Sequence, residues 1–158
     1  MRGKLTEAAA RSQMASLCAR AEMCSQEIRE KLLRKGLSPD ETESVIGWLR
    51  ENRFVDDERF AGAFARDKTA FAAWGPRKIR LALMQKRIPA AVVEGAVASL
   101  DAQAVADACF RVASQKARSL CLTDRDDRAR FCRHLLSRGF GMDHIRGAIA
   151  RLREEGRC

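Results

Sequence analysis

The stretch WGPRKIRLALMQKRI, from Trp74 to Ile88, decides the fold. Gly75 followed by Pro76 is typical of a helix start, because the first turn has no use for the N–H that proline lacks. Apolar side chains then recur at helical spacing, at Ile79, Ala82 and Leu83. This spacing predicts an amphipathic helix that turns one face toward a core.

The opposite side of this helix is cationic. No Asp or Glu occurs between Gly75 and Ile88, so nothing within the helix balances its charge. The cations are Arg77, Lys78, Arg80, Lys86 and Arg87. We expect them to be uncompensated and available to an anionic partner.

The same pattern occurs three times along the chain. The copies align without a gap at offsets of 51 and then 52 residues. Their register is set by Ile28, Ile79 and Phe131, and the match ends at Leu49, Leu100 and Leu152. A repeat of about 50 residues indicates copies of one supersecondary unit that stack on their neighbours. We therefore predict an all-α fold of three tandem three-helix repeats in an elongated, curved array. The repeats span 1–54, 55–100 and 101–158.

Composition and helix signals support three helices in each repeat. The chain has no Tyr, few β-branched residues and much Ala, Leu, Arg and Glu, which favours helix over strand. Ser38 to Glu41 reads SPDE, a capping box with proline in the first turn. The predicted helices cover 6–22, 26–35, 39–52, 57–73, 74–87, 89–99, 101–121, 123 or 124 to 139, and 141 or 143 to 155. The second of them is expected to point Ile28, Leu32 and Leu33 inward.

The residue that follows the middle helix differs between the repeats. Gly36 and Gly139 occupy this position in the first and third repeats, and Arg87 occupies it in the second. Glycine readily adopts the left-handed conformation that ends many helices, whereas arginine is strained in it. Either the second middle helix ends differently, or the Arg87 charge is kept there for a partner.

The charge of the whole chain favours an anionic partner. The net charge is +9 with a pI near 9.8, and it divides as +2, +3 and +4 over the three repeats. A basic protein with charge spread along its length typically binds a polyanion or an acidic protein surface. The sequence has no signal-peptide pattern and no membrane-spanning run. We expect a cytoplasmic protein with reduced thiols and no membrane partner.

No residue pattern indicates catalysis, a cofactor or a metal site. The chain lacks a glycine-rich phosphate loop. His134 and His144 have no nucleophile or metal ligand at a suitable spacing, so we expect both on the solvated surface. Asp56 and Asp57 fit the acidic start of a helix, with contact to a partner as the alternative.

Aromatic and thiol side chains fit a core better than a binding site. Phe60, Phe64 and Phe71 share one helical face. Such a row can stack on nucleic-acid bases, but a shared face is more typical of a core, and we expect core positions. The cysteines form no zinc-binding spacing. Those expected as small buried hydrophobes are Cys18, Cys109 and Cys132.

Cationic middle helices recur in the third repeat and, less strongly, in the first. Equivalent helices of a solenoid project in a regular series, which suits a helical polyanion or a filament with periodic acidic patches. The predicted residues for binding a partner or nucleic acid are Arg34, Lys35, Asp56, Asp57, Arg77, Lys78, Arg80, Lys86, Arg87, Arg128, Arg130 and Arg133.

Three segments resemble the RecX family, bacterial regulators of the recombinase RecA. They read CSQEIREKLLRKG over 24–36, FVDDERFA over 54–61 and GPRKIRLALMQKRI over 75–88. The resemblance covers nearly the whole chain and is weakest in the third repeat. Its pattern points to Asp56, Asp57, Phe60, Gly75, Pro76, Lys78, Ile79, Leu83, Lys86 and Ile88.

The resemblance implies a monomeric, non-enzymatic modulator without a cofactor. Proteins of this family bind the RecA–DNA filament, lodge in its groove and usually inhibit ATP hydrolysis and strand exchange. Single- or double-stranded DNA is then a partner at least within the filament. A groove binder can either block or stabilise a filament, so both directions stay open. The alternatives are a DNA-binding protein of general, sequence-independent affinity, and a helical scaffold for another acidic protein.

Overall fold

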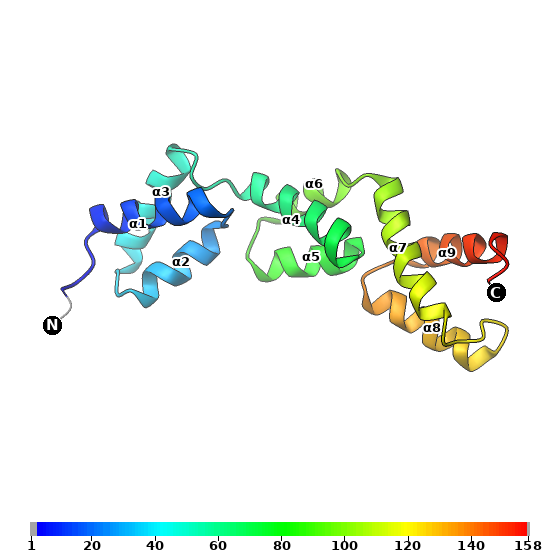
Figure 1. The fold of residues 1–158 in the computed structure, drawn as a ribbon. Helices are drawn as coiled ribbons and strands as arrows, with labels where there is room; N and C mark the ends of the chain where they lie inside the picture. The colour runs from blue at the N-terminus through cyan, green and yellow to red at the C-terminus, as the bar shows by residue number, and fades with distance from the viewer. Residues whose placement is uncertain (1–2, 158) are drawn as a thin grey trace.

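The computed structural model describes residues 3–157, and within that range it consists of nine helices and no strand. They are α1 (Glu7–Arg20), α2 (Ser25–Arg34), α3 (Pro39–Glu51), α4 (Asp57–Ala72), α5 (Pro76–Gln85), α6 (Ala90–Ala98), α7 (Ala102–Ala117), α8 (Arg125–Ser137) and α9 (Met142–Glu154). The helices form three successive units of three in an elongated array, with the termini at opposite ends (Figure 1). The predicted all-α fold is confirmed. Over the same range, no helix has both the length and the apolar character needed to cross a bilayer.

The middle helix of each unit lies along one edge of the array. Figure 1 shows α2, α5 and α8 in a row along the lower edge. Above them α1 packs on α3, α4 on α6, and α7 on α9. Residues at equivalent positions of the three middle helices are therefore repeated along a single edge.

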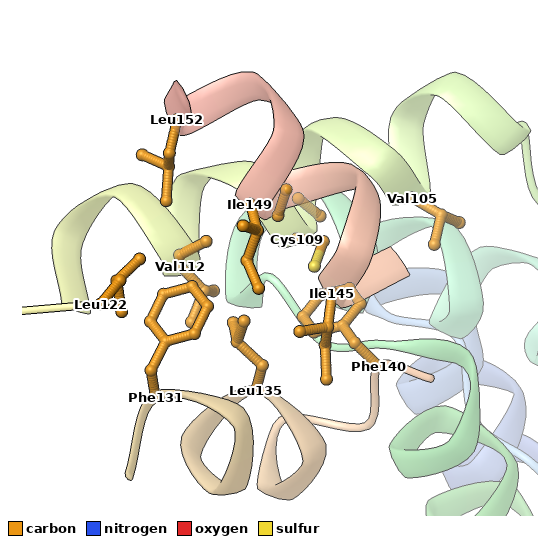
Figure 2. Packing of buried hydrophobic residues seen from close by; sticks show 13 residues of the cluster. Val105, Cys109, Val112, Leu122, Phe131, Leu135, Phe140, Ile145, Ile149 and Leu152 are labelled. Atoms are coloured by element: carbon orange, nitrogen blue, oxygen red, sulfur yellow. The ribbon is translucent and has the colours of Figure 1, made fainter. Parts of the chain in front are cut away.

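Each unit has its own apolar core. The first is built around Met14, Ile28, Leu32, Ile46 and Leu49, and the second around Phe60, Ile79, Leu83, Ile88 and Val93. The third includes Phe131, Leu135, Phe140, Ile145, Ile149 and Leu152. Figure 2 shows the α8 side chains of this third cluster directed toward those of α9. Each large apolar side chain buried in this way contributes about 1.5–3 kcal/mol. Three separate cores explain how an elongated array stays folded.

The predicted helix starts are largely confirmed. Ser38 caps α3 in a capping box, because its Oγ accepts from the Glu41 N–H at 3.2 Å and Glu41 Oε2 accepts from the Ser38 N–H at 2.8 Å. Gly75 is the N-cap of α5. The cap of α2 is Cys24, with the Glu27 carboxylate accepting from the Cys24 N–H at 3.3 Å.

The three middle helices end in the same way. Gly36, Arg87 and Gly139 have φ of 91°, 55° and 95°. Each donates its N–H to the carbonyl three residues earlier, at 3.0, 2.9 and 2.9 Å, and in each case the next N–H reaches back five residues at 3.2 Å. The alternative that the second middle helix ends differently is therefore wrong: Arg87 accepts the strained left-handed conformation.

The two junctions between units differ in kind. Between the second and third units, backbone meets backbone: the Gly75 N–H donates to the Arg138 carbonyl at 2.7 Å, and the Arg77 N–H donates to the Gly139 carbonyl at 3.1 Å. Arg111 of α7 adds a side-chain bond to the Thr69 carbonyl at 3.1 Å. This junction leaves no room for side chains between the two backbones.

Between the first and second units, side chains make the junction. The Ser25 N–H donates to Asp57 Oδ1 at 2.8 Å, and Arg59 Nε lies 2.6 Å from Glu22 Oε1. Cys24 is fully buried in the core of the second unit although it precedes α2. This junction depends on charge as well as on packing.

Candidate partner-binding surface

Arg80 of α5 is bonded to α6 rather than free in solvent. Its Nε and Nη2 lie 2.6 and 3.2 Å from the two carboxylate oxygens of Glu94. Arg29 and Glu43 make the same two contacts in the first unit, at 2.6 and 3.3 Å. Both pairs join residues 14 apart and tie the middle helix to the third helix of its unit. The expectation that Arg80 is uncompensated is therefore wrong.

Lys86 also has a partner within the protein. Its Nζ lies 2.6 Å from Glu27 Oε1 of α2 and over the rings of Phe60 and Phe64, at 5.7 and 5.9 Å from their centroids. The hydrogen bond to Glu27 raises the pKa of Lys86. The expectation that Lys86 is uncompensated is wrong as well, because this side chain joins the first and second units.

Lys78 faces an indole rather than a carboxylate. Its Nζ lies 4.5 Å from the ring centroid of Trp74, and Lys68 Nζ lies 4.7 Å from the same ring. Such cation–π contacts are worth about 0.5–2 kcal/mol, depending on desolvation. Trp74 therefore fixes the position of both cations.

The acids that precede and begin α4 have structural contacts. Asp56 Oδ1 accepts from the Arg59 N–H at 3.0 Å and so caps the helix, as predicted. Asp57 accepts from Ser25 across the junction between the first two units and lies 3.9 Å from Arg50 Nη2. A contact of either acid with a partner stays a prediction.

Six of the predicted cations remain exposed without an ion pair within residues 3–157. They occur as two on or just after each middle helix, and they are Arg34, Lys35, Arg77, Arg87, Arg128 and Arg133. Arg130 makes only a loose 3.6 Å pair with Asp127 and is mostly exposed. Since exposed pairs of this kind contribute little, Arg130 is also available to an anion. The structure thus places free positive charge along the edge formed by α2, α5 and α8 (Figure 1).

The sequence interpretation missed several exposed apolar side chains. Leu33, expected inward, is 43% exposed, and Phe71, expected in the core, is 88% exposed. Phe60 is buried as expected, and Phe64 is half-buried. Helical spacing could not separate Leu33 from its buried neighbour Leu32, because both fall within the width of one apolar face.

The two histidines are half-buried, although a solvated surface was expected. Burial lowers the pKa of His134, and the neighbouring charges of Lys116 and Arg138 act in the same direction. His144 packs edge-on against Phe140, with ring centroids 6.2 Å apart. Within the described residues, no group of three or more His, Cys, Asp or Glu could hold a metal ion.

Family models match all three units. The models for the first, second and third three-helix domains of RecX match residues 10–49, 56–97 and 105–149. The chain is similar to the regulatory protein RecX of Prosthecochloris aestuarii, with 34% identity over 131 residues that cover 83% of this chain and 85% of the relative. The regulatory protein RecX of Clostridium botulinum strain Eklund 17B is 33% identical over 127 residues, which cover 78% of this chain and 59% of the relative.

Two solved structures of similar fold are also described as RecX. The crystal structure of RecX from Lactobacillus salivarius aligns with a TM-score of 0.81 and 20% identity, covering 92% of this chain and 96% of that chain. A second crystal structure of regulatory protein RecX aligns with a TM-score of 0.78 and 21% identity, covering 87% of this chain and 68% of that chain. At these identities the likeness concerns the fold.

Proposed function

The chain belongs to the RecX family of regulatory proteins, and on this premise we propose that it binds the filament that RecA recombinase forms on DNA. Binding reduces the ATP hydrolysis and strand exchange of that filament. The relatives are called regulatory proteins, which supports a non-enzymatic role. The RecA filament and the DNA it contains are the proposed partners.

One observation carries this proposal. Unpaired cations recur as two on or just after each middle helix, and the middle helices lie along one edge of an elongated array (Figure 1). Unpaired cations spread over all three units suit an extended polyanionic partner, because each unit can then make a contact of its own. The cations assigned to the interface are Arg34, Lys35, Arg77, Arg87, Arg128 and Arg133.

The first experiment compares three targets at one salt concentration. Affinity is measured for naked single-stranded DNA, for free RecA and for the RecA filament on the same DNA, alongside filament ATPase activity. We expect tightest binding to the filament and a fall in ATPase activity at matching concentrations. Equal affinity for naked DNA and filament would instead support the second candidate, a DNA-binding protein without a recombinase partner, whose binding would weaken steeply with salt.

A charge-reversal variant tests the assigned surface. Arg77→Glu, Arg87→Glu and Arg133→Glu together should leave the fold intact and weaken filament binding by at least about tenfold. Arg80 is left unchanged because it pairs with Glu94. The matched control reverses Arg53, Arg66 and Arg118, exposed arginines that belong to or closely follow an outer helix of each unit and make no ion pair within the described residues. Equal losses in both variants would mean that net charge, not this surface, drives binding.

A further inference from the structure

Large apolar side chains are exposed at the same repeat position of all three units. Leu33, Met84 and Leu136 are 43%, 55% and 38% exposed. The repeat offsets of 51 and 52 residues relate these three positions to one another. Only six large hydrophobic side chains are exposed within residues 3–157, and half of them fall on this single position. Exposed apolar residues scattered at random over the surface would not be expected at the same repeat position in all three units.

The local backbone does not require an apolar side chain there. Each of the three residues uses its carbonyl to accept the N–H that ends the middle helix, at 2.9–3.0 Å. The core contact comes from the preceding residue, which is a fully buried leucine in every unit: Leu32, Leu83 and Leu135. A polar residue at the exposed position would keep both interactions and avoid exposing apolar surface to water.

The three side chains form what we call the apolar row, one residue from each of α2, α5 and α8. These helices lie along one edge of the array (Figure 1). In the middle unit Leu81, 61% exposed and three residues before Met84, enlarges the apolar area on the same helix. The row is therefore most extensive at the centre of the molecule.

The chemistry of the row favours a protein partner over a nucleic acid. Leucine and methionine side chains have no ring to stack on a base and no donor for a phosphate or a base edge. Unpaired cations lie within a few residues of each member of the row: Arg34 and Lys35 follow Leu33, Arg87 follows Met84, and Arg133 precedes Leu136. An apolar pocket bordered by carboxylates complements such a surface.

We propose that the apolar row of Leu33, Met84 and Leu136 docks on the protein subunits of the filament, one apolar pocket for each unit, while contacts with DNA rest on the cations alone. This inference depends on the proposed function, since it assigns the protein-contacting part of the same interface. Each buried side chain should contribute about tenfold to affinity.

The test is a triple variant, Leu33→Gln, Met84→Gln and Leu136→Gln. Glutamine keeps helix propensity and length while removing the apolar surface. We expect at least about a hundredfold loss of affinity for the recombinase filament, unchanged affinity for naked single-stranded DNA and an unchanged unfolding midpoint. The control pair Phe71→Gln and Met142→Gln replaces exposed apolar residues outside the row and should bind the filament as the wild type does.

The outcomes separate this inference from the proposed function. If the wild type does not bind the filament, both fail. If the wild type binds and the folded triple variant binds as tightly, the row is not the docking surface, although the proposed function stands. If the triple variant loses affinity for the filament and for naked DNA to the same extent, the row contacts nucleic acid and the inference is wrong. Should the triple variant fail to fold, Met84→Gln alone, at the most exposed position, must still show about a tenfold loss specific to the filament.

Discussion

Gly75 and Gly139 meet backbone to backbone at the junction between the second and third units. A Cβ on Gly75 would fall 2.3 Å from the carbonyl carbon and oxygen of Gly139. The turn after α8 is thereby seated on the first turn of α5, and the Arg138 side chain donates to the Ala72 carbonyl beside it. Gly75 is the N-cap of α5 and also contacts the backbone of the third unit directly. The helix start and the close backbone contact both favour glycine at this position.

Gly75→Ala should separate the second and third units. The added methyl group cannot fit against rigid backbone, so we expect the free energy of unfolding to fall by about 2–3 kcal/mol. Urea unfolding measures the loss, and hydrogen exchange should be faster at the backbone amides of positions 75 and 77, which donate across the junction. Gly95→Ala in α6 is the matched control, because its Cβ meets nothing within 4 Å and alanine favours helix. Equal stability of the two variants would contradict the tight junction.

Arg87→Gly should stabilise the protein. Arg87 holds the left-handed conformation that glycine holds in the other two units, and removing that strain should raise the free energy of unfolding by about 0.5–1 kcal/mol after the entropy of glycine in the unfolded chain is included. Arg87→Ala removes the charge and keeps the strain, so it should show no such gain. If both variants lose filament affinity equally, the charge of Arg87 contributes to binding and explains why a strained arginine occupies this position. If both variants bind as tightly as the wild type, Arg87 has no role in binding.

Local signals in the sequence predicted the repeat, the helices and most of the caps, because these depend on residues close together in the chain. Ser38 with Glu41 and the left-handed Gly36 are examples. Phe71 shares a helical face with Phe60 but belongs to none of the three cores. Its exposure depends on which turns of α4 the neighbouring helices cover. Periodicity carries no information on where a neighbouring helix ends.

The ion pair between Arg80 and Glu94 could have been predicted from the repeat. Arg29 with Glu43 and Arg80 with Glu94 stand at equivalent repeat positions and at the same separation. An acid that recurs opposite a cation in two copies indicates a structural pair. The third unit has Cys132 and Arg146 at these positions and lacks the pair.

These pairs predict an acid-sensitive contribution to stability. Hydrogen bonds from Arg29 and Arg80 lower the pKa of Glu43 and of Glu94. A lowered carboxyl pKa stabilises the folded state above the unfolded value of about 4.3, and the contribution is lost as the pH falls through the folded pKa. Glu43→Gln with Glu94→Gln should therefore lower the urea midpoint at pH 7 and have little effect at pH 3.

The control for the acid effect is Glu51→Gln, at an exposed glutamate that makes no ion pair within the described part of the chain. Its urea midpoint should match the wild type at both pH values. High salt should shrink the difference between the double variant and the wild type, because the Glu43 and Glu94 carboxylates of both pairs are exposed to solvent. A difference of the same size at pH 7 and pH 3 would show that the carboxylates act by packing rather than by charge.

The thiols should react in a fixed order. Cys121 is exposed, and its hydrogen bond with Thr123 at 3.0 Å lowers its pKa, whereas burial raises the pKa of Cys109 to about 12. Thiolate is the reactive form, so a thiol reagent at pH 7.5 should label Cys121 first and Cys109 only on unfolding. Cys24 is also buried and burial raises its pKa, so it should likewise be labelled only on unfolding. Cys158 lies outside the described residues, so peptide mapping by mass spectrometry is needed to assign each label.

Thr123→Val isolates the hydrogen bond behind this order. The variant keeps Cys121 exposed but removes the hydroxyl, so its labelling rate should fall at pH 7.5 and the rate profile should move to higher pH. The labelling of Cys109 should not change, because burial alone raises its pKa. Fast labelling of Cys109 in the folded wild type would mean that the third unit opens readily, which its own buried core argues against.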